Sequence, residues 1–96
     1  MQAEKDPALV ALGQQIRKVR RARQISQEDF AAQAGLDRSY YGGVERGERN
    51  VAALNLMRIA VALNCEVGEL FPLSPVLGDL LKGLAGDERT GKAYKA

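Results

Sequence analysis

Two short helix-like segments separated by a glycine turn constrain this chain more than any other feature of its sequence. In SQEDFAAQAG, Ser26 is placed to cap a helix and Gly35 to end it, because helices commonly terminate at a glycine in the left-handed conformation. Only Leu36 and Asp37 precede the second segment, RSYYGGVERG, and Asp37 is itself a favoured capping residue. The pattern therefore predicts two helices joined by a very short turn.

The apolar spacing of both segments supports this interpretation. The first helix would bury Phe30, Ala31 and Ala34, and the second would run from residue 38 to residue 46 before Gly47 ends it. A glycine-containing turn of about three or four residues between two short helices is the signature of a helix-turn-helix motif.

Helical spacing also dominates the rest of the chain, which contains no strand pattern. Asp6 and Pro7 predict the start of a helix that runs to about Arg23. The stretch ALNLMRIAVALN predicts a helix over 53–64, and CEVGELF predicts one or two helical turns after it. The predicted buried faces contain Leu9, Leu12, Ile16, Val19, Leu56, Ile59, Ala60 and Leu63.

Two prolines divide the chain. Pro72 and Pro75 bracket a break, after which a sixth helix is expected over 75–85. From Gly86 onward the chain has few apolar groups, so a disordered tail is expected. We predict an all-α fold of five helices in a helix-turn-helix domain over 7–72, with a C-terminal extension over 73–96.

Composition narrows the class of protein. The 96 residues, 46% hydrophobic and 27% charged, predict one small soluble domain without a membrane span. Cys65 is the only cysteine and histidine is absent, which favours an intracellular protein with no disulfide and no metal, and Cys65 is expected to be a small buried apolar residue. The net charge of +2 is uninformative, but residues 14–24 hold five cations and no anion. Such a run is often simply a solvated helix face.

The predicted helix over 38–46 contains Gly42 and Gly43, which together cost about 2 kcal/mol of helix propensity relative to alanine. At about 100° per residue, both glycines fall on one face with Arg38, Ser39 and Arg46, while Tyr41 and Val44 fall on the opposite face. We expect Tyr41 and Val44 to anchor the helix and the glycines to leave bare backbone that comes close to a surface. The alternatives are a Gly-Gly loop and merely solvated arginines.

DNA is the surface that suits this arrangement. The major groove admits a helix and presents guanine O6 and N7, which arginine can bind together. Arg38 is predicted to make this contact because it lies at the start of the helix, where groove contacts concentrate. Ser39 can bond a base edge or a phosphate, and Tyr40 can touch the DNA backbone or a thymine methyl, or can simply pack.

Residues 16–71, from IRKVRRARQISQEDFAAQAGLDRSYYGGVERGERN to RIAVALNCEVGELF, resemble the Cro/C1-type (XRE) helix-turn-helix family of phage and bacterial repressors. Within that family, LDRSYYGGVERGERNVAALNLMRIAVAL is most similar to the controller proteins of restriction-modification systems. The resemblance implies a five-helix Cro/repressor-like bundle, a homodimer, a two-fold symmetric operator in double-stranded DNA, and a cytoplasmic protein of bacterial or phage origin.

The resemblance also implies roles for individual residues. It places Gln27 at a phosphate beside the positive end of its helix. It places four residues in the base-reading register: Arg38, Ser39, Tyr40 and Gly43. It places three near the DNA backbone: Arg46, Arg49 and Asn50. It pairs Arg20 with Glu45 as an internal ion pair, although both could instead belong to solvated faces.

Two departures from the family pattern stand out. Gly43 lacks the side chain that contacts bases in relatives, so the sequence that is read would be shorter or would depend more on DNA shape. The helix over 53–64 opens with NVAAL rather than with proline and serine or threonine, which leaves its start undefined by a residue or two.

One short helix makes too few contacts for useful selectivity, so a dimer that reads two half-sites is expected. The predicted dimer interface, which the segment 75–85 could extend, contains Leu54, Met57, Val67 and Phe71. Each of these residues could instead belong to the core.

Two other classes of function remain to be weighed. A protein of this fold can bind protein instead of DNA, as an adaptor or an antitoxin-type regulatory module. An enzyme is disfavoured, because the chain has no histidine, no phosphate-cradling glycine loop and no evident carboxylate pair. We therefore expect no catalytic residues and no cofactor.

Overall fold

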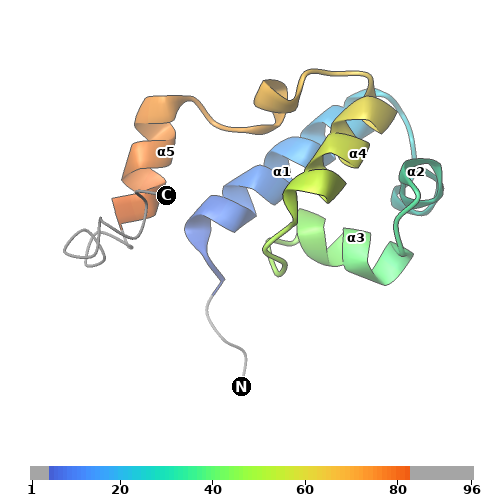
Figure 1. Cartoon of the computed structure of the whole chain (residues 1–96), viewed down its shortest axis with the longest axis horizontal. Coiled ribbons are helices and arrows are strands. Elements are labelled where there is room, and N and C mark those ends of the chain that lie inside the picture. The colour runs from blue at the N-terminus through green and yellow to red at the C-terminus, as the bar shows by residue number, and fades with distance from the viewer. Residues whose placement is uncertain (1–4, 83–96) are drawn as a thin grey trace.

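The computed structural model describes residues 5–82, which form an all-helical bundle followed by a separate short helix (Figure 1). The elements in chain order are α1 (Pro7–Ala22), α2 (Gln27–Ala34), α3 (Arg38–Glu45), α4 (Ala53–Leu63), the 3-10 helix η1 (Val67–Leu70) and α5 (Ser74–Leu80). No strand occurs within the described part of the chain. The predicted all-α fold is confirmed.

Capping residues set the helix ends as the sequence predicted. The Asp6 side chain accepts a hydrogen bond from the Ala8 amide at 2.8 Å, and Ser26 accepts one from the Asp29 amide at 3.0 Å. Gly35 ends α2 with a φ of 72°. The start of α4 has no side-chain cap, which matches the departure from the family pattern seen there.

The core lies where α1, α2, α3, α4 and η1 converge. Its largest fully buried side chains are Tyr41, Phe30, Ile16, Ile59, Leu63, Leu70 and Val44. The rings of Phe30 and Tyr41 pack with centroids 5.1 Å apart, which joins α2 to α3. The predicted core faces are largely correct, although Leu9, Val19 and Leu56 are only half-buried.

A close backbone contact between α1 and α3 was not predicted. Gly13 in α1 lies against the backbone of α3, so that a β carbon there would overlap the carbonyl oxygens of Val44 and Glu45. Gly47 meets α1 as well, since a β carbon on it would lie 2.6 Å from Val10 Cα. Two glycines therefore let α1 and the end of α3 touch through their backbones.

Beyond η1 the chain leaves the bundle, and the main helix contact of α5 is with α1 (Figure 1). The helix begins at Ser74 and ends at Leu80, and the predicted residues 83–85 and the predicted disordered tail lie outside the described residues. Val76 and Leu81 of this segment are exposed. Within residues 5–82, no helix combines the length and the apolar character needed to cross a bilayer.

Candidate nucleic-acid interface

The polar side of α3 faces outward as predicted. Asp37 caps the helix by accepting a hydrogen bond from the Tyr40 amide at 2.9 Å. Tyr41 and Val44 are buried in the core, while Arg38, Ser39 and Arg46 are exposed. The apolar side of α3 therefore fixes which side chains reach solvent.

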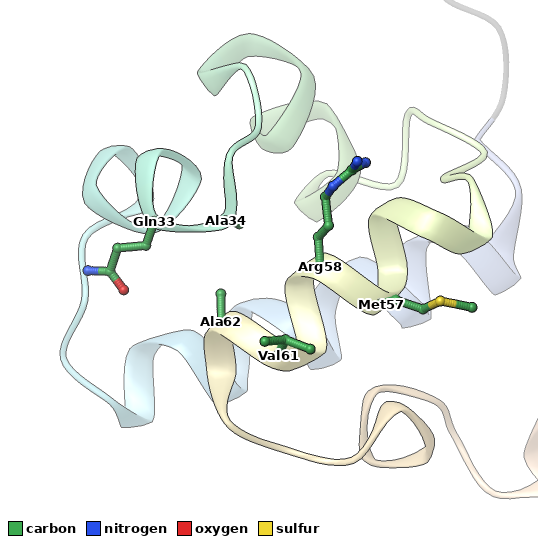
Figure 2. A pocket seen from close by; sticks show the side chains of 6 residues that line it. All are labelled: Gln33, Ala34, Met57, Arg58, Val61 and Ala62. Carbon is green, nitrogen blue, oxygen red and sulfur yellow. The ribbon is translucent and has the colours of Figure 1, made fainter.

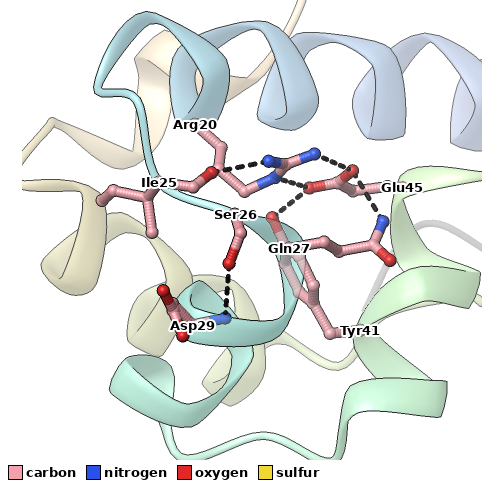
Figure 3. Close-up of polar contacts among 7 residues, drawn as sticks. All are labelled: Arg20, Ile25, Ser26, Gln27, Asp29, Tyr41 and Glu45. Carbon is pink, nitrogen blue, oxygen red and sulfur yellow. Dashed lines mark hydrogen bonds and ion pairs between the residues drawn. The ribbon is translucent and has the colours of Figure 1, made fainter.

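A buried polar network holds α3 in place (Figure 3). Arg20 of α1 donates from Nε to Glu45 Oε2 at 2.6 Å and from Nη2 to Oε1 at 3.0 Å. Its Nη1 donates to the Ile25 carbonyl at 2.7 Å. The Tyr41 hydroxyl also donates to Glu45, and Gln27 Nε2 donates to Glu45 Oε1 at 3.0 Å. One carboxylate thus ties α1, the start of α2 and α3 together.

The network keeps Glu45 ionised. Burial alone would raise the pKa of this carboxyl group, but hydrogen bonds from Arg20, Tyr41 and Gln27 outweigh it and lower the pKa below its usual range. The pKa of Arg20 is raised, chiefly by its hydrogen bond to Glu45. The pKa of Tyr41 is raised by burial and by the neighbouring carboxylate. The ion pair is therefore a fixed feature of the folded state at neutral pH.

The Gln27 side chain is only partly available to DNA. The residue is half-buried, and its side-chain amide donates a hydrogen bond to Glu45. It still lines an outward-facing groove of about 420 Å³, together with Asp37, Arg38, Ser39, Gly42 and Arg46. The beginnings of α2 and α3 thus meet at one groove.

The prediction that the two glycines leave bare backbone is wrong. Gly42 and Gly43 are buried, because two arginine side chains fold back over them. A β carbon on Gly42 would lie 3.0 Å from Arg46 Nη1, and one on Gly43 would lie 3.0 Å from Arg49 Cγ. The space beside each glycine is therefore occupied by an arginine side chain, one from the end of α3 and one from the loop after it.

Tyr40 combines packing with polar contacts. Its ring is half-buried, its hydroxyl accepts a hydrogen bond from Asn55 Nδ2 at 3.1 Å, and the Arg49 guanidinium lies 5.7 Å from the ring centroid. Asn55 was missed by sequence reasoning, because only the fold brings α4 to this ring. Asn50, in the same loop as Arg49, is exposed.

A second, apolar surface runs along α4. Leu54, Met57 and Val61 are exposed to 57%, 53% and 79%, so Leu54 and Met57 are not core residues. Figure 2 shows Met57, Arg58, Val61 and Ala62 of α4 beside Gln33 and Ala34 of α2, around a pocket of about 350 Å³.

The two remaining predicted interface residues differ from each other. Val67 is exposed to 39%, and Phe71 is half-buried and packs against the core. Phe71 also lines a groove of about 570 Å³ between α1 and η1. Sequence reasoning missed Val61, although its spacing from Leu54 and Met57 places it on the same side of α4.

Two capped helices joined by a glycine turn, the second anchored by apolar side chains and polar outside, define a helix-turn-helix DNA-binding protein. The family model described as helix-turn-helix matches residues 16–70. The chain belongs to this family, the XRE-type helix-turn-helix transcription regulators.

Relatives of known structure share this fold. The restriction-modification controller protein C.AhdI from Aeromonas hydrophila is 54% identical, with a TM-score of 0.65 over 66% of this chain and 96% of its own. The controller protein C.Esp1396I, solved as a tetramer with its natural 35 base-pair operator, is 29% identical, with a TM-score of 0.61 over 78% and 91% of the two chains. A relative compared by sequence alone, the control protein C.MunI from Mycoplasma sp, is 43% identical over 63 residues, which are 65% of this chain and 85% of that protein.

Proposed function

We propose that this chain is a transcription regulator that binds a palindromic operator in double-stranded DNA as a homodimer. In this proposal residues 7–72 form the DNA-binding domain, and α3 enters the major groove. The observation that carries the proposal is the fixed outward face of α3. Tyr41, Val44 and the Arg20–Glu45 pair hold the inner side, so the exposed Arg38 and Ser39 have a defined orientation.

Arg38 and Ser39 are assigned to base edges. Both line the groove where the starts of α2 and α3 meet, and Arg38 can bind O6 and N7 of one guanine. Gln27 lies at the first turn of α2, where backbone N–H groups and the positive end of the helix suit a phosphate. Phosphate contacts at α2 would set the register in which Arg38 reads.

The second group of contacts comes from the end of α3 and the loop after it. Arg46 lies over Gly42 and lines the groove that contains Arg38, whereas Arg49 lies over Gly43 and beside the Tyr40 ring. The position of Arg46 supports a contact inside the groove, and that of Arg49 supports a contact to the DNA backbone. Asn50 and the Tyr40 ring edge complete the set as backbone contacts, with the Tyr40 hydroxyl already bonded to Asn55.

The homodimer is proposed to form through the apolar side of α4. The predicted residues Leu54 and Met57 are exposed, and Val61 extends them by one helical turn. Val67 and Phe71 are the other two residues of the predicted interface, and Val67 is the more exposed of them. A stripe of large apolar side chains that water would otherwise surround favours burial against a second copy.

The relatives support the same class of function. Several are control proteins of restriction-modification systems, and one is described as a tetramer on operator DNA. We therefore assign this chain a regulatory role in the bacterial cytoplasm rather than an enzymatic one.

The experiment is a gel shift with duplexes recovered from a random-sequence pool, comparing the wild type with Arg38→Ala. The substitution is expected to cost about 1 to 3 kcal/mol and to relax preference at one base pair. Wild-type affinity is expected to fall steeply with added salt, because phosphate contacts release counterions. No DNA binding at low salt would contradict the proposal and would favour a protein-binding adaptor or antitoxin-type module.

A further inference from the structure

The Arg46 side chain, which is 53% exposed, has two neighbours in the free protein, Gly42 and Glu48. Its Nη1 lies 3.0 Å from the position that a β carbon on Gly42 would take, and its Nε lies 3.1 Å from Glu48 Oε1. Arg46 is the C-cap residue of α3, and Gly42 lies four residues earlier on the same side of the helix. The guanidinium therefore turns back along the helix and fills the space that the glycine leaves.

Glu48 is itself fixed by the end of α3. Gly47 takes the left-handed conformation with a φ of 77°. The Gly47 amide then donates to the Val44 carbonyl at 3.1 Å, and the Glu48 amide donates to the Gly43 carbonyl at 2.8 Å. This bond pattern is a Schellman motif, in which the backbone position of the residue after the glycine is set by the helix.

The Glu48 carboxylate lies between two cations. Its Oε1 faces Arg46 Nε, and its Oε2 lies 3.5 Å from Lys5 Nζ. Arg46 lowers the pKa of Glu48, a carboxylate that is ionised at neutral pH in any case. Glu48 contacts Arg46 at Nε. The same Arg46 side chain lines the groove that contains Arg38 and Ser39.

We propose that Glu48 is a positioning residue, which holds the Arg46 guanidinium over Gly42 so that it faces DNA acceptors in the groove beside Arg38. This inference rests on the proposed DNA-binding function and adds a residue that does not itself touch DNA. A free arginine side chain loses rotamer freedom when it binds, and holding it in place beforehand reduces that loss. The negative charge of Glu48 at the same time weakens attraction to any DNA phosphate backbone.

Two substitutions separate positioning from charge. Glu48→Gln and Glu48→Ala both remove one negative charge, but only glutamine keeps an oxygen that accepts from Arg46 Nε. Both variants are expected to bind unrelated duplex DNA a few-fold more tightly than the wild type. The ratio of affinity for the selected duplex to affinity for unrelated duplex is expected to be about fivefold lower in Glu48→Ala than in Glu48→Gln, which corresponds to one hydrogen bond.

The measurement uses the full chain and the tightest duplex that the wild type selects from a random-sequence pool. Asp79→Asn is the charge control. Asp79 lies on α5 rather than on α3 and pairs with Lys82, with 3.4 Å between Oδ1 and Nζ, so its substitution should leave the ratio unchanged. In an Arg46→Ala background, the two Glu48 variants should give equal ratios, because the Arg46 guanidinium, which glutamine can bind and alanine cannot, is absent.

Equal ratios for Glu48→Ala and Glu48→Gln in the presence of Arg46 would overturn the positioning role while leaving the proposed function intact. A wild type that selects no duplex would instead overturn the proposed function, and the positioning role with it.

Discussion

Gly13 in α1 and Glu45 in α3 touch through their backbones, and a β carbon on Gly13 would lie 2.8 Å from the Glu45 carbonyl carbon. Glu45 also carries the carboxylate that binds Arg20, so this close backbone contact and the buried ion pair occur at the same residue. The placement of α3 relative to α1 thus depends on one glycine that carries no functional group.

Gly13→Ala is therefore expected to destabilise the protein. The added methyl meets backbone atoms that cannot rotate away, so α1 and α3 must separate, at a cost of about 1 to 3 kcal/mol or more. Gly78→Ala is the control, since a β carbon on Gly78 in α5 meets nothing within 4 Å. It should instead stabilise slightly. Urea unfolding of both variants measures the difference, and equal midpoints would contradict the close contact at Gly13.

The Glu45 network predicts a loss of stability in acid. The pKa of Glu45 is lower in the folded chain than its unfolded value of about 4.3, so the folded state is favoured above that pH. This contribution is lost as the pH falls through the lower, folded pKa. Unfolding free energies measured from pH 7 to pH 3 should therefore drop more steeply for the wild type than for Glu45→Gln. Parallel curves would show that Glu45 is not paired.

The Tyr41 hydroxyl is expected to contribute separately. Tyr41→Phe removes one donor to a buried carboxylate while keeping the ring that packs on Phe30, so the expected cost is about 1 to 2 kcal/mol. Thermal or urea unfolding at pH 7 measures this cost. A variant as stable as the wild type would mean that Arg20 and Gln27 satisfy Glu45 by themselves.

Gly42→Ala is expected to separate stability from DNA binding. Alanine raises helix propensity by up to about 1 kcal/mol. The new methyl would crowd only the far end of the Arg46 side chain, at 3.0 Å, with Gln27 Oε1 at an ordinary contact distance of 3.4 Å. The variant should be at least as stable as the wild type. It should bind its selected duplex more weakly, because the new methyl displaces the Arg46 guanidinium from its position over Gly42. Gly78→Ala should gain stability and leave binding unchanged. Unchanged DNA affinity in Gly42→Ala would contradict a role for the Arg46 position.

The α4 surface predicts the oligomeric state. Met57→Lys places a charge in the middle of the exposed stripe and should shift the protein from dimer to monomer in sedimentation experiments. The added lysine would attract DNA phosphates, so weaker DNA binding by Met57→Lys could not come from charge repulsion. Gln14→Lys, exposed on α1, is the control and should remain dimeric. A dimeric Met57→Lys would place the interface elsewhere, for example at α5.

Local rules explain what the sequence predicted. Caps such as Ser26 and Asp37 and the left-handed Gly35 act within a few residues, and helical spacing alone places Tyr41 and Val44 in the core. These features are sufficient to define two helices and the outward face of the second.

Features made by tertiary contact were missed. The glycine at position 13 gives no sign in the sequence of which backbone it touches. The same holds for the arginines that cover Gly42 and Gly43, because the turn after α3 decides where long side chains lie. The Asn55–Tyr40 bond joins residues of α4 and α3 that only the tertiary fold brings together.

Selection of duplexes from a random-sequence pool by the wild-type chain tests the central claim most directly. The outward face of α3 and a symmetric dimer predict a palindromic consensus whose half-site centres lie about 34 Å apart, one turn of DNA. Sequencing of the bound duplexes should also show a guanine in each half-site whose enrichment disappears with Arg38→Ala. A pool without enrichment, or an enriched sequence without two-fold symmetry that Arg38→Ala leaves unchanged, would contradict this account.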